Sequence, residues 1–172
     1  MYVKQLRVAG IPDAQLTLLP YAIQTDKNEN VQLHSGHGSR RSKLRLPEDK
    51  RIIISVGAVN AHHKRMDYVV HEFSRLAPKE YFLLIVGQLD QLSEGVLALA
   101  KMKLRFDSYQ ILQLGQEDMK DYLFDSDYCI LASLHEGLPR VLLEALGAGL
   151  LPILHDSSVT RDAMNEYGFL AT

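Results

Sequence analysis

Two glutamates stand eight positions apart in the stretch "HEGLPRVLLEAL", residues 135–146. Glu136 precedes a Gly-Leu-Pro turn, whereas Glu144 lies among apolar residues that predict a helix. Burying a carboxylate with such a helix costs several kcal/mol unless it is hydrogen-bonded. A sugar diol could satisfy both oxygens of Glu144, which makes the pair a candidate sugar-binding site. The alternative is that Glu144 lies on the exposed strip of an amphipathic helix.

The turn between the two glutamates is typical of the start of a helix that binds an anion. Pro139 suits the first turn of a helix, where its missing N–H costs nothing. Gly137 allows a backbone or a ligand to approach closely, and the free amides of the turn could hold a phosphate.

A second group of candidates is the basic stretch "GAVNAHHKR", residues 57–65. It places His62, His63, Lys64 and Arg65 at the start of a predicted helix, where the helix dipole disfavours positive charge. A bound anion would turn this conflict into an advantage. The alternative is a solvated basic turn without a ligand.

Other residue types that could do chemistry are better explained by structure. Asp125 and Asp127 have a spacing that can hold a metal, but between a helix and a strand they favour turn and capping roles. Cys129 lies in an apolar run and predicts a buried thiol in a reducing compartment. We assign no metal site, because the four histidines considered lack ligand spacing: His34, His37, His62 and His63.

The elements that position these residues alternate from residue 51 onward. Apolar runs predict strands at 51–57, 81–87, 109–115, 127–133 and 150–154, with a further candidate at 168–172. Helical patterns predict helices at 64–76, at 92–104 with an interruption at Gly95, at 117–126 and after residue 139. Continuous apolar strands with intervening helices predict an α/β fold, a doubly wound, Rossmann-like parallel sheet covered on both faces.

The first fifty residues differ from this alternation. The stretch "AQLTLLPYAI", residues 14–23, predicts one more strand, and residues 34–50 predict a long polar loop. The expected organisation is therefore a connection, first strand and loop at 1–50, followed by a ligand-binding domain at 51–172.

Composition bounds the function. The chain has 172 residues, of which 47% are hydrophobic and 23% charged, as expected of one globular domain. Its net charge of −2 gives no overall electrostatic attraction to nucleic acid or to an anionic membrane. It shows no apolar stretch long enough to span a bilayer and no signal peptide, so we expect a cytoplasmic protein. The sequence has no G-x-G-x-x-G motif after the first strand and no Walker lysine loop. The motifs that would indicate a dinucleotide-dependent dehydrogenase or a P-loop NTPase are therefore missing.

These residues resemble a known family. The stretches "SVGAVNAHHKRMDYVV", "YFLLIVG", "ILQLG" and "DYCILASLHEGLPRVLLEALGAGLLPIL" are similar to the C-terminal, nucleotide-sugar-binding half of retaining GT-B glycosyltransferases of family 4, or group 1. The resemblance covers residues 51–170, and its E-x7-E signature is highly specific in that context. It implies a fragment of a longer two-domain enzyme, whose acceptor domain lies upstream and whose final helix lies downstream.

The resemblance implies a role for each site residue. Glu136 would face the donor sugar and support the reacting centre, and Glu144 would accept hydrogen bonds from the ribose hydroxyls. Lys64 would bind the diphosphate, assisted by Arg65, and act with Glu136 in catalysis.

Further donor contacts are implied at two other places. The residues around the diphosphate and sugar would be Gly137, Leu138, Arg140 and Val141, largely through their amides. Ile111 and Leu112 would contact the base from a strand end. The family commonly has an arginine where this sequence has Ala58, so Arg65 or His63 is expected to compensate.

The implied reaction is transfer of a hexose from a nucleotide sugar with retention at the anomeric carbon. It would need no metal or other cofactor, and it would act in polysaccharide biosynthesis. The acceptor would be a glycan or a lipid-linked molecule held by the upstream domain, with peripheral association at the inner membrane face as an option. Two alternatives stay open: a non-catalytic nucleotide-sugar-binding module, and a GT-B epimerase or phosphorylase.

Overall fold

The computed structural model describes residues 6–16, 37–134, 139–157, 160–161 and 169–171. The strands are β1 (Arg51–Val56), β2 (Tyr81–Val86), β3 (Tyr109–Leu112), β4 (Tyr128–Leu131), β5 (Leu151–His155) and β6 (Phe169–Ala171). The α-helices are α2 (His37–Lys43), α3 (Met66–Phe73), α4 (Glu94–Lys103), α5 (Gln116–Phe124) and α6 (Arg140–Gly147). Two 3-10 turns are η1 (Asp13–Gln15) and η2 (Gln91–Ser93).

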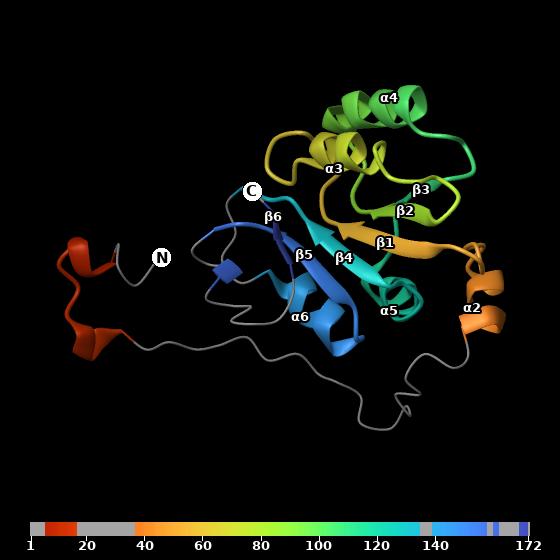
Figure 1. Ribbon diagram of the computed structural model, residues 1–172. Helices are drawn as coiled ribbons and strands as arrows, with labels where there is room; N and C mark the ends of the chain where they lie inside the picture. The colour runs from red at the N-terminus through yellow and green to blue at the C-terminus, as the bar shows by residue number, and fades with distance from the viewer. Residues whose placement is uncertain (1–5, 17–36, 135–138, 158–159, 162–168, 172) are drawn as a thin grey trace.

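The described strands form one parallel sheet in the order β3-β2-β1-β4-β5-β6. This is the strand order of the doubly wound Rossmann fold, and it confirms the predicted fold class. In Figure 1, α3 and α4 cover one face of the sheet, while α5 and α6 cover the other. The order of the strands reverses between β1 and β4, which are neighbours in the sheet.

The sheet is buried because its central strands are apolar on both sides. In β1, Ile52 and Ile54 pack into the core on the side of α5 and α6. Ile53 packs into a second core on the side of α3 and α4. A strand covered on both faces reads as a continuous apolar run, which explains why the sequence pattern located β1 and β2 well.

Cys129 belongs to this buried core, as predicted. Its side chain is fully buried in β4, and burial raises the pKa of the thiol to about 12. The thiolate, which is the reactive form, is therefore disfavoured at neutral pH.

The prediction of a polar loop at 34–50 is wrong for its described part. Helix α2 occupies His37–Lys43, and Leu46 is buried in the core beside α5 and α6. The cause is Arg41, whose side chain is 6% exposed. Its guanidinium donates hydrogen bonds to the carbonyls of Asp125 and Lys50 and to the Asp127 carboxylate. Helix α2 is held by these distant partners, and a local pattern does not show them.

Two smaller differences concern element ends. The helix predicted at 92–104 is not interrupted at Gly95. It begins as the 3-10 turn η2, which changes into the α-helix α4 at Glu94, and Gly95 lies in the first turn of α4. For the strand predicted at 14–23, the structure has the 3-10 turn η1 at its first two residues, and residues 17–23 lie outside the described residues.

Candidate functional site

The loops after β1 and β4 meet the conditions for a ligand site in a parallel sheet. Both loops start at the carboxyl ends of neighbouring strands, at the point where the strand order reverses. Helix α3 leaves β1 towards one face, and α6 leaves β4 towards the other (Figure 1). Diverging helices of this kind leave a crevice in which open α/β sheets bind their ligands.

Lys64 lies over the end of β1. A Cβ atom built on Gly57 would stand 2.9 Å from Cε of Lys64, so the glycine leaves room for the lysine stem. Gly57 also has a φ of +148°, which a residue with a side chain rarely adopts. The structure therefore places the partly buried Lys64 at the carboxyl edge, where the sequence predicts a phosphate-binding lysine.

Gly87 sets how closely the loops after β1 and β2 approach each other. A Cβ atom on Gly87 would lie only 1.6 Å from the backbone oxygen of Gly57. The amide of Gly57 donates to Val86 O at 2.9 Å, which extends the strand pairing into the loop. Gly87 was not among the predicted site residues, although its place at the end of a predicted strand is a usable signal.

Asn60 organises the loop that carries the basic residues. Its side-chain oxygen accepts the amides of His62 and His63, at 3.2 and 3.3 Å, and its backbone oxygen accepts the amide of Met66. The side chains of His62 and His63 are exposed. Sequence reasoning missed Asn60, although asparagine is a residue type that commonly bonds the backbone two positions on.

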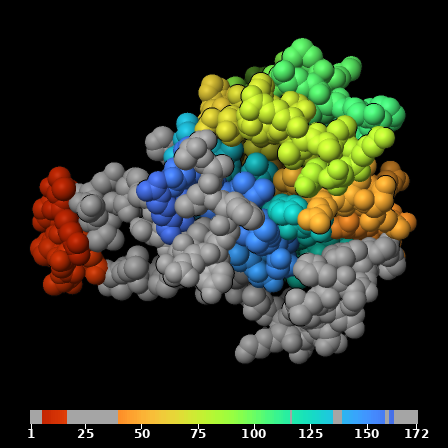
Figure 2. All heavy atoms as spheres, viewed as in Figure 1, coloured from red at the N-terminus to blue at the C-terminus, as the bar shows by residue number. Residues whose placement is uncertain are grey.

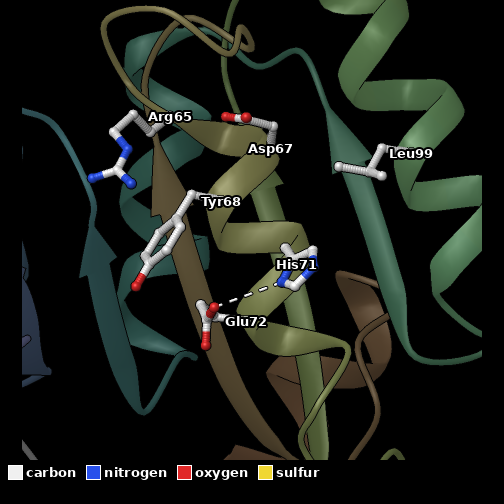
Figure 3. Close-up of a pocket in the computed structure, with 6 residues that line it drawn as sticks. All are labelled: Arg65, Asp67, Tyr68, His71, Glu72 and Leu99. Atoms are coloured by element: carbon white, nitrogen blue, oxygen red, sulfur yellow. Dashed lines mark ion pairs between the residues drawn. The ribbon is translucent and has the colours of Figure 1, made fainter.

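Arg65 packs against α3 rather than over the end of β1, where Lys64 lies. It has a left-handed backbone conformation with φ of 50°, and its guanidinium carbon lies 4.3 Å from the centre of the Tyr68 ring. Figure 3 shows Arg65, Tyr68 and Glu72 along one side of α3. They belong to a surface hollow of about 380 Å³ whose other lining residues are Asp67, His71 and Leu99. This hollow was not predicted from the sequence.

Helix α6 carries the second glutamate. Pro139 is buried and precedes the helix without a side-chain cap. The amide of Leu142 donates to the carbonyl of Pro139 at 3.0 Å, and the amide of Val141 belongs to the first turn, whose amides have no carbonyl one helical turn earlier to bond. Glu144 is partly buried, with 20% of its side chain exposed, and accepts a hydrogen bond from Arg140 Nε at 2.9 Å. Arg140 is thus the observed partner of Glu144, and the hydrogen bonds from ribose hydroxyls that the resemblance implies stay a prediction. Three predicted residues, Glu136, Gly137 and Leu138, lie outside the described residues.

Ile111 and Leu112 end the edge strand β3. Ile111 packs towards the core beneath α3 and α4, whereas Leu112 packs towards the other core. They are separated from β4 by β2 and β1, so the proposed base contact would lie at one end of the carboxyl edge. Just beyond them, Gln113 accepts the amide of Leu89 through its side-chain oxygen.

The carboxyl end of β5 adds a third loop at this edge. The Arg161 guanidinium is paired with the carboxylate of Asp156, and this hydrogen bonding lowers the pKa of Asp156. Thr160 is buried and donates its hydroxyl to the carbonyl of His155 at 2.8 Å. These contacts link Thr160 and Arg161 to the carboxyl end of β5.

Asp127, considered as a metal ligand, lies at the opposite end of the strands and has structural partners. Its Oδ2 accepts the amide of Ile52 at 2.7 Å as well as the Arg41 guanidinium. Within the described ranges, no three His, Cys, Asp or Glu side chains are grouped to hold a metal ion. No helix in the described part of the chain is long and apolar enough to cross a membrane.

Solved structures share this fold. A glycosyltransferase from Rickettsia africae ESF-5 matches 98% of this chain and 46% of its own, with 18% identity and a TM-score of 0.82. WaaG, a glycosyltransferase involved in lipopolysaccharide biosynthesis, matches 94% of this chain and 44% of its own, at 20% identity and a TM-score of 0.75.

A third match is HepE of Anabaena, solved in complex with UDP-glucose. It matches 79% of this chain and 38% of its own, with 14% identity and a TM-score of 0.68. The chain thus spans less than half the length of each of these proteins, and its fold is that of the Rossmann-like domain of GT-B glycosyltransferases. No curated protein sequence compared with the chain matches it significantly.

The family assignment comes from the sequence profile. Residues 38–171 match the profile described as glycosyl transferases group 1. The match covers well over half of the chain, and it includes all of α2 but its first residue, both loops of the candidate site and all described strands. The chain therefore belongs to the group 1 glycosyl transferases.

Proposed function

We propose that the chain is the donor-binding domain of a retaining glycosyltransferase of family 4, which transfers a hexose from a nucleotide sugar. The observation that carries the proposal is the placement of Lys64 and Glu144. They lie on the elements that follow β1 and β4, the two strands on either side of the switch point. The complex of HepE with UDP-glucose supports a nucleotide-sugar ligand for a domain of this fold.

The phosphates would be held by a cation and by helix amides. Lys64 would supply the charge from the side of β1, and first-turn amides of α6, such as that of Val141, would bind the phosphates from the side of β4. Charge that develops on the departing nucleoside diphosphate would be stabilised by this arrangement. Because Ala58 replaces the arginine common in the family, Lys64 would carry more of this task.

Glu144 would recognise the ribose. Its carboxylate already accepts one hydrogen bond from Arg140, whose side chain is 63% exposed. An ionised carboxylate can accept several hydrogen bonds, so a ribose diol can bind without displacing Arg140. Glu136 would face the donor sugar, and Ile111 and Leu112 would contact the base.

The acceptor would be a glycan or a lipid-linked molecule bound by a second domain. The carboxyl edge of the sheet would form one wall of the binding site, and the second domain of the GT-B enzyme would form the opposite wall. The proposal includes a role in polysaccharide biosynthesis and a cytoplasmic location, since the buried Cys129 is typical of a reducing compartment.

Calorimetric titration of the 172-residue chain with uridine, adenosine, guanosine and thymidine diphosphates tests the proposal. One of these nucleotides should bind in the micromolar to millimolar range, and the same affinity should be found with Mg²⁺ and with EDTA. Binding that appears only with Mg²⁺ would contradict a metal-independent phosphate site. Absence of binding by all four nucleotides would overturn the proposal.

The two alternatives make different predictions for the enzyme that contains this domain. A non-catalytic module would bind the nucleotide sugar and form no glycoside with any acceptor. An epimerase or a phosphorylase would change the donor without an acceptor or would require inorganic phosphate. NMR of the product distinguishes all three, because retention gives a glycoside with the anomeric configuration of the donor.

A further inference from the structure

Arg140 and Glu144 form an ion pair on one face of α6, four positions apart. Nε of Arg140 donates to Oε1 of Glu144 at 2.9 Å. Arg140 is the first residue of the helix, and its side chain is largely exposed, whereas that of Glu144 is mostly buried. Figure 2 shows α6, in blue, reaching the surface of the molecule. The pair therefore places an accessible guanidinium directly beside the carboxylate that the proposed function assigns to ribose.

The stability of α6 does not explain this order of charges. The first turn of α6 contains no acidic residue, and the positive end of the helix dipole opposes a cation there. A glutamate that precedes its basic partner by four positions stabilises a helix better than the reverse order, and the reverse order is present here. A pair with one largely exposed partner also contributes little to folding. The placement of Arg140 is therefore better explained by a ligand than by the helix itself.

The basic residues that precede α3 are placed differently. Lys64 lies over the end of β1, and the guanidinium of Arg65 packs on the Tyr68 ring. Helix α3 covers the opposite face of the sheet from α6, so Arg65 and Glu144 belong to different faces. Arg140, in contrast, is in direct contact with Glu144. A ligand group that lies next to the ribose would meet the guanidinium of Arg140.

We propose that the side chain of Arg140 binds the α-phosphate of the nucleotide, the phosphate that is attached to the ribose. The proposal rests on the proposed function, because it requires a ribose on Glu144. A ribose held there brings its own phosphate close to a guanidinium bonded to the same carboxylate. Arginine has five N–H donors in a planar fork that suits phosphate oxygens, and the bond from Nε to Glu144 uses one of them.

This contact differs from those that the resemblance implies around the start of α6. Those contacts are made largely by backbone amides, which any residue supplies, whereas the contact proposed here needs the guanidinium. Arg140 and Glu144 then act as one unit, in which the carboxylate holds both the ribose hydroxyls and the arginine that reaches the phosphate. The consequence is that Arg140 should matter for every ligand with an α-phosphate and for none without it.

Titration calorimetry with a nucleoside, its monophosphate and its diphosphate tests this consequence. The base is the one whose diphosphate the 172-residue chain binds best among uridine, adenosine, guanosine and thymidine diphosphates. Arg140→Ala should weaken binding of the monophosphate and the diphosphate by the same factor, about 10- to 150-fold, the range for hydrogen bonds to charged groups. Binding of the nucleoside should hardly change. An equal loss for the nucleoside would mean that Arg140 only positions Glu144, and it would overturn the proposal.

Arg75→Ala is the matched control for this experiment. Arg75 pairs with Glu72 on α3 at 3.2 Å, and its side chain is 66% exposed, close to the 63% of Arg140. The variant therefore breaks a similar ion pair outside the candidate site, and it should bind all three ligands like the unmodified chain. Losses as large as those of Arg140→Ala would show a general charge effect and would contradict the proposal. Melting curves of both variants ensure that only folded protein is compared.

Phosphorus NMR of the bound diphosphate identifies the phosphate that Arg140 contacts. At saturating protein, the signal of the α-phosphate should differ between the unmodified chain and Arg140→Ala more than the signal of the β-phosphate. A difference confined to the β-phosphate would overturn the proposal. Equal binding of the diphosphate by both proteins would overturn this proposal alone, whereas failure of the unmodified chain to bind any of the four diphosphates would overturn the proposed function as well.

Discussion

At the scale of single residues, Lys64 offers the clearest test of the phosphate site. Lys64→Ala should weaken nucleoside diphosphate binding by roughly 1.5–3 kcal/mol, the range for hydrogen bonds to charged groups. Binding of the bare nucleoside should change little, because the lysine is expected to meet only the phosphates. Calorimetry with both ligands measures the two effects. His62→Ala is the control, since the His62 side chain is exposed and only its backbone amide contacts Asn60.

The two glutamates should fail in different ways when they lose their charge. Glu144→Gln should weaken nucleoside diphosphate binding, because the ribose loses an ionised acceptor. Its effect on stability should stay near 0.5 kcal/mol, since the partner Arg140 is largely exposed. Glu136→Gln should leave this binding almost intact and, in an enzyme that includes the acceptor domain, reduce turnover far more than donor affinity.

Glu117→Gln is the control for the glutamate variants, because Glu117 is 91% exposed on α5. Titration calorimetry and melting curves on all three variants separate a ligand effect from a folding effect. Loss of nucleoside diphosphate binding in Glu136→Gln but not in Glu144→Gln would reverse the assigned roles.

At the scale of elements, substitution by alanine should lower the stability of the chain at Gly87 and raise it at Gly95. Gly87→Ala would place Cβ against the backbone oxygen of Gly57, so either the strand ends or the loop that carries Lys64 must shift. We expect lower stability and weaker nucleotide binding. Gly95→Ala meets no atom within 4 Å and lies in the first turn of α4, so it should stabilise the chain by up to about 1 kcal/mol. Urea unfolding of both variants measures the contrast, and equal effects would show that the close approach is unimportant.

Helix α2 should depend on one buried side chain. Arg41→Met removes three hydrogen bonds and leaves the Asp127 carboxylate without its cation. The loss should be about 3 kcal/mol of unfolding free energy, near the lower end for a broken buried pair because Asp127 is 31% exposed. Arg40→Met, at the exposed neighbouring position, should cost little. Hydrogen exchange of the α2 amides shows whether the helix detaches, and unchanged exchange would contradict this role for Arg41.

At the scale of the whole molecule, the chain should bind a nucleoside diphosphate but transfer no sugar by itself. It spans 46% of the Rickettsia africae protein and 44% of WaaG, and under the proposed function a second domain completes the active site. Affinity should be modest, because less ligand surface is buried when one wall is absent. Incubation of the isolated chain with radiolabelled nucleotide sugars and acceptors checks this expectation. Efficient transfer would show that the second domain is not needed.

Local pattern in the sequence determined the parallel sheet and the position of the second glutamate. Strands such as β1 and β2 are buried on both faces, so their apolar runs are continuous and show where each begins and ends. Pro139 and the helical pattern around Glu144 are equally local signals, because they involve residues a few positions apart. These features place α6 at the carboxyl edge of the sheet without any knowledge of distant contacts.

Only the tertiary structure decided the features that depend on residues far apart in the chain. Arg41 turns an apparently polar loop into a docked helix by bonding to groups 84 and 86 positions away. Gly87 matters because the oxygen of Gly57 comes against it, and Glu144 is partly buried because α6 packs beside β5 and α5. Exposure of Phe106 likewise became visible only once the core was assembled. A sequence pattern records which residues favour burial or charge, whereas the partner that each one meets is set by how the whole chain packs.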